Sequence, residues 1–274
     1  FQFMIRTSVE RVEVAPRTED APKFNFVVSM KDFFKNRAAM GATVQPVAMF
    51  LGTYGAATAS TVMFQAYFEN TAISGLMTII TMLPMLFFIP FTKKLTEKYG
   101  KKEASAFGLI FSIIACALLC VVPIPANGTG IAIYMLLQLL NGLGMGVAMC
   151  MGNAMMADAI DYNEWKTGKR EEGITYSLHS FFRKLAQGVG PAVALVIMNS
   201  LGYVNNAVDE FGNESIDVTL LSWDVAVSLR YLVAALFLVS AIMQFVGLGL
   251  VYNLDKKTLA KMNAELEERR NGEA

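Results

Sequence analysis

The sequence predicts an all-α integral membrane protein, a bundle of six transmembrane helices. Hydrophobic residues make up 54% of the chain and charged residues 17%, with a mean hydropathy of +0.44, which separates it from soluble domains. The charges are also segregated. Tracts of roughly 18 to 27 residues carry few or none, which is the length that crosses a ~30 Å hydrocarbon core. Lysines and arginines, finally, gather in alternate connections.

The predicted spans cover, in order, residues 37–65, 72–91, 104–122, 130–157, 174–202 and 225–252. Lysines and arginines cluster before the first span, between spans two and three, around the connection between spans four and five, and in the tail. The other connections, 66–71, 123–129 and 203–224, contain none. The positive-inside rule therefore places both ends in the cytoplasm, and we expect a multi-pass protein of the cell (inner) membrane.

The two ends of the chain are polar. We divide the sequence into a cytoplasmic linker (1–36), the helix bundle (37–254) and a cytoplasmic tail (255–274). Apolar residues in 27–34 predict an interfacial helix, whereas 7–23 fit a linker and a disordered arm equally well. The tail is predicted to be a charged, solvated surface helix, with Leu259, Met262 and Leu266 at helical spacing. Because the chain begins at Phe1 without a signal peptide, we expect a fragment of a longer protein.

Several spans contain residues that bend helices or let them pack closely, such as Pro46, Pro84 and Pro191. The glycine run at 141–146 lies mid-membrane with no strand before it, so close helix packing or a bendable helix is favoured over a nucleotide loop. Transporters, channels and membrane enzymes all use such helices. The three cysteines lie within spans, which favours apolar packing over disulfides, and with the single histidine they show no metal-ligand spacing.

Residues 158–173 form a strongly charged connection between two apolar spans, which we interpret as the cytoplasmic hinge of a transporter. The helix dipole alone explains the acids that begin span five. At the end of span four, acids spaced by three residues share a helix face where negative charge is unfavourable, so they need cationic partners. The nearest are Lys166, Lys169 and Arg170. The candidate gating residues are Asp158, Asp161, Glu164, Arg170 and Glu172.

Two cations, Arg183 and Lys184, lie about eleven residues into span five, or ~16 Å along the helix. Intramembrane charges cost on the order of 2.5–3.5 kcal/mol each, so each needs a partner. We expect that partner to be a substrate, a carboxylate outside this chain, Asp158, or an acid on a neighbouring span. A polar face that looks onto a water-filled cavity is predicted by the helical spacing of Tyr176, Ser180, Arg183 and Gln187.

Other polar residues in the spans leave two interpretations open. His179 fits either a hydrogen-bonded packing residue or a proton carrier. Four amides could each bind a substrate hydroxyl or tie two helices together: Gln45, Gln138, Asn141 and Asn153. Arg230 lies near the outer face with Asp224 and water within reach, and we predict that it is an anchor and not part of a site.

Residues 156–174, followed by Ser177, Phe181, Lys184 and Gly202-Tyr203, closely resemble the signature of the glycoside–pentoside–hexuronide:cation symporters, a family of the major facilitator superfamily. The basic segment 90–102 also resembles a loop of that superfamily, although it lacks the usual aspartate. The resemblance implies the C-terminal half of a twelve-helix transporter, whose cation site lies in the N-terminal bundle. It also implies that Lys184 faces the sugar and cation sites. Met149 stands where a melibiose-transporting member has a tryptophan, which argues against a stacked galactoside.

We therefore expect secondary active transport of a sugar or glycoside, coupled to Na⁺ or H⁺ by alternating access, and no enzymatic activity, cofactor or metal in this chain. Expected partners are the sugar, the lipid bilayer and an N-terminal six-helix bundle, and no nucleic acid. The alternatives are a cation-coupled transporter of lipid or other non-sugar cargo, or a non-transporting membrane sensor. The candidate substrate-binding residues are Lys184, Arg183, Tyr176, His179, Gln187, Met149 and Asn153.

Overall fold

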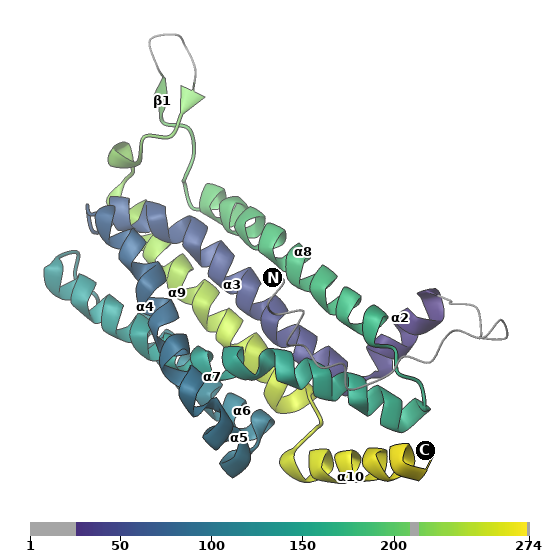
Figure 1. Cartoon of the computed structure of the whole chain (residues 1–274). Coiled ribbons are helices and arrows are strands. Elements are labelled where there is room, and N and C mark those ends of the chain that lie inside the picture. Colours follow the sequence, from purple (N-terminus) through teal and green to yellow (C-terminus); the bar gives the residue numbers. More distant parts are fainter. Residues whose placement is uncertain (1–25, 209–213, 273–274) are drawn as a thin grey trace, which may run out of the picture.

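The computed structural model describes residues 26–208 and 214–272, and this part of the chain is almost entirely helical (Figure 1). The long helices are α3 (Arg37–Ala66), α4 (Ala72–Phe88), α6 (Lys101–Val121), α7 (Gly128–Thr167), α8 (Glu172–Ser200) and α9 (Trp223–Phe245). Shorter helices are α2 (Phe26–Lys35), α5 (Thr92–Tyr99) and α10 (Lys256–Gly272), with the single turns η1 (Ile89–Phe91), η2 (Val218–Leu220) and η3 (Val246–Val251). A two-stranded antiparallel hairpin, β1 (Ala207–Val208) and β2 (Glu214–Ser215), lies between α8 and α9.

The predicted all-α membrane class is confirmed, with five helices long and apolar enough to cross a bilayer. They are Arg37–Ala66, Lys101–Val121, Gly128–Thr167, Glu172–Ser200 and Trp223–Val251. The second predicted span, 72–91, is divided between the 17-residue α4 and the turn η1, so it falls short of that length. The predicted linker helix is present as α2. Most of the predicted linker (1–25) and the loop acids Asp209 and Glu210 lie outside the described residues.

Local sequence sets the ends of these helices. The side chains of Asn36, Asn127 and Ser222 each accept a hydrogen bond from a backbone N–H three residues later, so they cap α3, α7 and α9. Gly168 ends α7 in the left-handed conformation (φ 70°), which glycine adopts without steric cost. The prolines at 46, 84 and 191 do not end their helices, because neighbouring helices stabilise the bundle around them.

Two helices organise the packing. α3 contacts α8 and α9 along its length, and α7 contacts α4 and α6 in the same way, while α7 and α8 touch only slightly (Figure 1). In two of these contacts, α6 with α7 and α3 with α8, the two backbones approach each other closely. A Cβ on Gly144 of α7 would lie 2.5 Å from the carbonyl oxygen of Gly108 on α6, and one on Gly190 of α8 would lie 2.6 Å from that of Leu51 on α3. The glycine run therefore serves close helix packing, as predicted.

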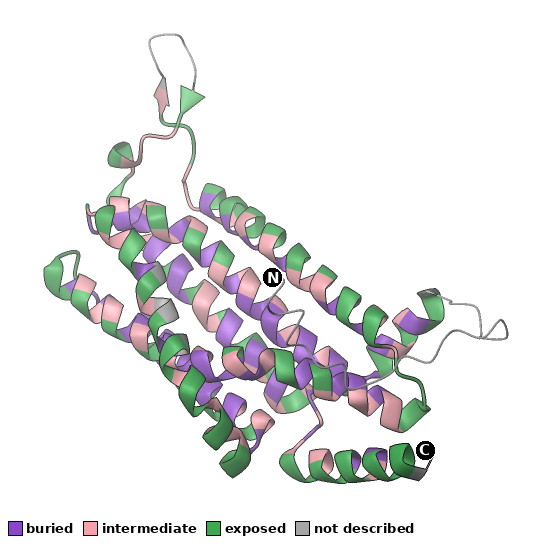
Figure 2. Cartoon of the chain, in the orientation of Figure 1, coloured by how far each residue is buried: buried purple, intermediate pink, exposed green. Residues whose placement is uncertain are grey.

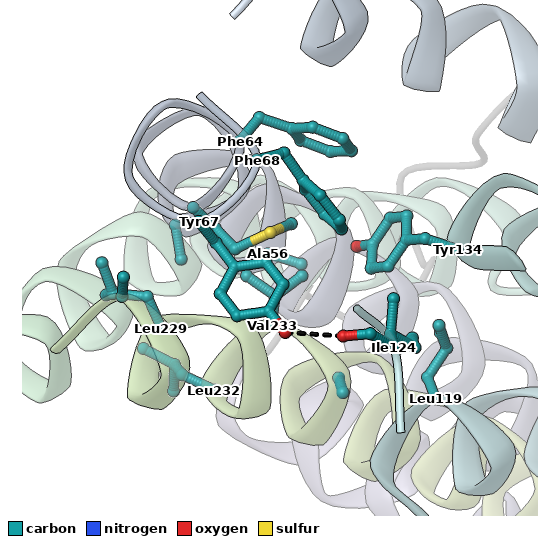
Figure 3. Close-up of a cluster of buried hydrophobic side chains, with 14 of the residues drawn as sticks. Ala56, Phe64, Tyr67, Phe68, Leu119, Ile124, Tyr134, Leu229, Leu232 and Val233 are labelled. Carbon is teal, nitrogen blue, oxygen red and sulfur yellow. Dashed lines mark hydrogen bonds between the residues drawn. The ribbon is translucent and has the colours of Figure 1, made fainter. Parts of the chain in front are cut away.

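The buried side chains form two clusters. One, towards the hairpin end of the bundle, is rich in aromatic residues (Figure 3), and the hydroxyl of Tyr67 donates a 2.6 Å hydrogen bond to the carbonyl of Ile124 there. The other, towards α10, is built from methionines and alanines of α3, α6 and α7. The helix α8 is the least buried of the five membrane-length helices among the described residues: 22% of its most apolar stretch is buried, against 44 to 50% in the other four (Figure 2).

Arg230 belongs to the aromatic end of the bundle, and its predicted role as an outer-face anchor is wrong. The side chain is 3% exposed and so does not reach water. Its Nη1 donates to the carbonyl of Leu119 at 3.3 Å, and its guanidinium lies 4.0 Å from the ring centroid of Tyr231. Within the described residues it forms no ion pair with Asp224. Backbone and aromatic faces thus replace the expected carboxylate.

We expect Gly144→Val to lower the free energy of unfolding by about 1–3 kcal/mol, because the added Cβ meets backbone that cannot move aside. Thermal unfolding of the detergent-purified protein checks this. Gly188→Val is the matched control, since a Cβ there meets no atom within 4 Å. Equal melting temperatures for the two variants would contradict the packing role.

Candidate functional site

Arg170 holds together the acids at the end of α7 and the start of α8. Its Nη1 lies 2.6 Å from Asp161 and 2.7 Å from Glu164, and its Nε lies 3.4 Å from Glu172. Partial burial lowers the pKa of Arg170, but its hydrogen bonds to Glu164 and Asp161 outweigh that effect and raise the pKa above its ordinary value. The predicted pairing of Arg170 with these acids is therefore confirmed. Their gating role stays a prediction.

The backbone positions Arg170 for these contacts. Gly168 turns the chain back at the end of α7, and the Asn163 side chain donates to the carbonyl of Lys169 at 3.1 Å. The hydroxyl of Thr167 accepts from the Lys169 N–H at 3.2 Å. These bonds hold the short connection against the last turn of α7. The side chain of Arg170 therefore points at Asp161 and Glu164.

Asp158 does not join this cluster. Both of its carboxylate oxygens accept from Lys101 Nζ, at 2.6 and 2.7 Å, and the two side chains are only 13% and 22% exposed. We had expected a partner among Lys166, Lys169 and Arg170, or a contact with Arg183 and Lys184, and both expectations are wrong. The pair instead ties the first residue of α6 to the last third of α7.

The tail helix α10 docks beside the same cluster. Glu164 accepts from Arg270 at 3.0 Å as well as from Arg170, and the indole of Trp165 donates to Glu265 at 2.6 Å. Met262 is fully buried and Leu266 is 4% exposed. The predicted helix is confirmed, but the expectation of a wholly solvated tail is wrong, because one face packs on the end of α7.

The polar side chains predicted on α8 divide between two environments. Tyr176 is 46% exposed and Lys184 is exposed, whereas Arg183 and Gln187 are half-buried. His179 is 3% exposed, and its Nδ1 lies 3.1 Å from the hydroxyl of Thr43 on α3. That contact supports the packing interpretation of His179.

Arg183 and Lys184 have no acidic partner among the described residues. The guanidinium of Arg183 lies 6.0 Å from the ring centroid of Phe50, and its Nε is buried without a hydrogen-bond acceptor in this part of the chain. The Nε of Arg230 is buried without an acceptor in the same way, but Arg183 is only half-buried, so an acceptor from outside the described residues can reach it.

Met149 and Asn153 lie exposed on α7, and within the described residues neither shows a contact with the polar residues of α8. Asn153 lies about two turns and Met149 about three turns before Asp161 on α7, with Met149 and Asp161 about 120° apart around the helix. Since α7 and α8 both pack on α3 and are joined at Arg170, the two exposed faces meet at one end.

The remaining amides tie helices together. Gln45 donates to Gln244 at 3.0 Å, and Asn141 accepts from Ser112 and donates to Gln138 at 3.1 Å. These side chains are 0 to 3% exposed, which supports the packing interpretation for them.

Sequence reasoning missed four contributors to these sites: Thr43, Phe50, Lys101 and Arg270. A signal existed for Lys101, because the start of one span and the end of the next lie on the same side of a membrane. Nothing in the sequence placed the tail arginine beside Glu164, because that contact depends on how α10 folds back.

Comparison with known proteins gives consistent matches. A family model described as MFS/sugar transport protein matches residues 1–256. An uncharacterized symporter of Bacillus subtilis (strain 168), YjmB, is 29% identical over 211 residues, which cover 76% of this chain and 44% of that protein. The glucuronide carrier protein homolog of Escherichia coli (strain K12) is 28% identical over 185 residues, covering 66% of this chain and 39% of that protein.

A third relative, the isoprimeverose transporter of Lactiplantibacillus pentosus, is 30% identical over 146 residues, which cover 53% of this chain and 30% of that protein. The matched stretches cover 44%, 39% and 30% of these three relatives, so the chain corresponds to only part of each.

We expect Asp158 and Lys101 to be coupled by about 0.5–3 kcal/mol in a double-mutant cycle. Either Asp158→Asn or Lys101→Gln leaves a largely buried charge unpaired, whereas the double variant leaves none. Thermal unfolding of the four proteins measures the coupling. Lys93 and Glu97, 3.9 Å apart and 86% and 64% exposed, form the control pair, with a coupling of about 0–1 kcal/mol. Additive losses at Asp158 and Lys101 would refute the pair.

Proposed function

Because this chain belongs to the MFS/sugar transport protein family, whose members are transporters and not enzymes, we propose that it carries out secondary active transport of a sugar or glycoside. The observation that carries the proposal is the pair of adjacent cations on α8, the half-buried Arg183 and the exposed Lys184, neither of which has an acidic partner within the described residues. Charged groups at that depth in a helix bundle are retained where a substrate or an ion supplies the compensating charge.

We propose that the chain acts as the C-terminal six-helix bundle of a twelve-helix transporter. Two observations support this: the chain matches only part of the length of three transporter and symporter relatives, and α8 leaves most of its surface uncovered. The second bundle would cover the exposed faces of α7 and α8 and would hold the site for Na⁺ or H⁺. Substrate would then lie between the bundles, against Arg183, Lys184 and Asn153.

The charges favour a substrate that carries an anionic group. Relatives with such cargo in their names include the glucuronide carrier protein homolog and the putative sulfoquinovose importer of Escherichia coli (strain K12). A guanidinium whose Nε lacks an acceptor matches the planar oxygens of a carboxylate or sulfonate. The exposed hydroxyl of Tyr176 would bind sugar hydroxyls in the same cavity.

Alternating access requires a contact that forms in one state and breaks in the other. We propose the Arg170 cluster for this role, because it joins the ends of α7 and α8, two helices that otherwise touch only slightly. Glu172 and Asp161 reach it from opposite sides of the connection. Separation of α8 from α7 would break these pairs and open the cytoplasmic end of the cavity.

Uptake measurements test the transport proposal. We expect membrane vesicles that carry the protein as its gene encodes it to accumulate a labelled glucuronide more than the matching glucoside when a Na⁺ or H⁺ gradient is imposed. Galactosides, xylosides and α- and β-glucosides complete the panel. Lys184→Ala should abolish accumulation with expression intact, whereas Leu185→Ala, a change at its exposed neighbour, should leave it unchanged. Accumulation of none of these sugars by the folded protein would refute sugar transport and favour lipid cargo or a sensor.

We expect Arg170→Gln to change the maximal rate of uptake more than the half-saturating substrate concentration, because the cluster lies at the end of the cavity and not against the substrate. Asp161→Asn should act in the same direction. Lys169→Gln removes an adjacent charge that forms no ion pair within the described residues, so it serves as the control. A change confined to substrate affinity would contradict gating.

A further inference from the structure

An apolar groove of about 810 Å³ runs along the outside of the bundle between α4, α5, α6 and α7. Its floor consists of small buried residues, Gly108, Ala115 and Gly144, where α6 and α7 approach closely. Its rims carry large exposed side chains, such as Phe107 (63% exposed) and Phe111 (53% exposed). None of its lining residues belongs to α3 or α8, so the groove is separate from the candidate transport site.

The length and lining of the groove suit a hydrocarbon chain. It follows α6 from Glu103 to Leu118, which is about 22 Å by helical rise. Apart from Tyr99 and Glu103 at one end, its lining residues are apolar, so an extended acyl chain can lie along its length.

One end of the groove is basic. A smaller hollow of about 350 Å³ shares Leu95 and Tyr99 with it and adds Lys94 and Lys98. Neither lysine pairs with an acid among the described residues.

Other charges also lie at this end. Glu97 pairs with Lys93, and Lys101 with Asp158, while Glu103 lies on the groove wall. The Nζ of Lys256 donates to the backbone carbonyls of Glu97 and Lys98 and adds positive charge there. This is the end of the bundle that the positive-inside rule assigns to the cytoplasm.

We propose that this groove is a binding site for an anionic phospholipid of the cytoplasmic leaflet. Its acyl chains lie on the floor formed by Gly108, Ala115 and Gly144, and its phosphate lies between Lys94 and Lys98. Burial of acyl methylenes supplies the affinity, and the two lysines supply the preference for negative headgroups. A free phosphate would leave the apolar length of the groove unused. The site does not depend on the sugar transport proposed above.

Brominated lipids, which quench tryptophan fluorescence on contact, test the site. The reporter is Phe111→Trp, a conservative change on the groove rim. It is made in the protein as its gene encodes it, and Trp165 and Trp223 are replaced by phenylalanine. A second reporter, Val239→Trp on α9 (Val239 is 55% exposed), monitors the surrounding lipid. Both are measured in phosphatidylcholine vesicles containing a small fraction of brominated phosphatidylglycerol or brominated phosphatidylcholine.

From the quenching of Phe111→Trp, we expect the groove to prefer phosphatidylglycerol to phosphatidylcholine at least fivefold, since one lysine at a membrane surface supplies about a fivefold preference. The two lipids should quench Val239→Trp equally. Lys94→Gln with Lys98→Gln should remove the preference. Lys257→Gln with Lys261→Gln, the same charge change in α10, should leave it unchanged.

Three results would overturn the proposal. Equal quenching of Phe111→Trp by both lipids would mean that the groove holds the same lipid as the surrounding bilayer, without a preference for negative headgroups. A preference that survives loss of Lys94 and Lys98 would place the headgroup elsewhere. A reporter that neither lipid quenches, while Val239→Trp is quenched, would mean that protein covers the groove.

Discussion

The cost of placing charge inside an apolar bundle explains how the cations of this chain are arranged. Lys101 is paired by a carboxylate on the adjacent helix, and Arg230 is surrounded by a backbone carbonyl and aromatic rings. The Nε–H groups of Arg183, which lies against Phe50, and of Arg230 both lack an acceptor within the described residues. Arg183 differs from Arg230 in that it is only half-buried, lies on the least buried of the membrane-length helices and stands beside the exposed Lys184. A group from outside the described residues can therefore reach it, and this favours α8 for the candidate site.

The same constraint shapes the end of the bundle where α7 stops and α8 begins. Acids at the C-terminus of a helix oppose its dipole, so the last turn of α7 needs cations. The fold supplies them from three parts of the chain: Lys101 at the start of α6, Arg170 in the following connection and Arg270 in the tail. Glu164 accepts from the last two at once. The connection, the tail and α7 therefore share one electrostatic cluster.

Much of this arrangement follows from sequence patterns that act locally. Hydropathy and charge segregation predicted the helices, and spacing predicted the contact of Arg170 with Asp161, because both lie within one turn-and-connection unit. Residues that meet across the fold were not predictable in the same way. Asp158 was assigned to the wrong cations, and Arg230 to the wrong environment, because spacing along one helix does not say which neighbour it faces. The depth of Arg183 was predictable, but its position against Phe50 was not.

The close approaches at Gly144 and Gly190 have a mechanical consequence. A contact between two side chains can absorb a shift by changing rotamers, whereas a contact between two backbones has no such slack. We therefore expect α6 and α7 to behave as one rigid unit, and α3 and α8 as another. Between α7 and α8 the packing is sparse and charge–charge contacts replace the backbone approach, so this seam lacks the same rigidity.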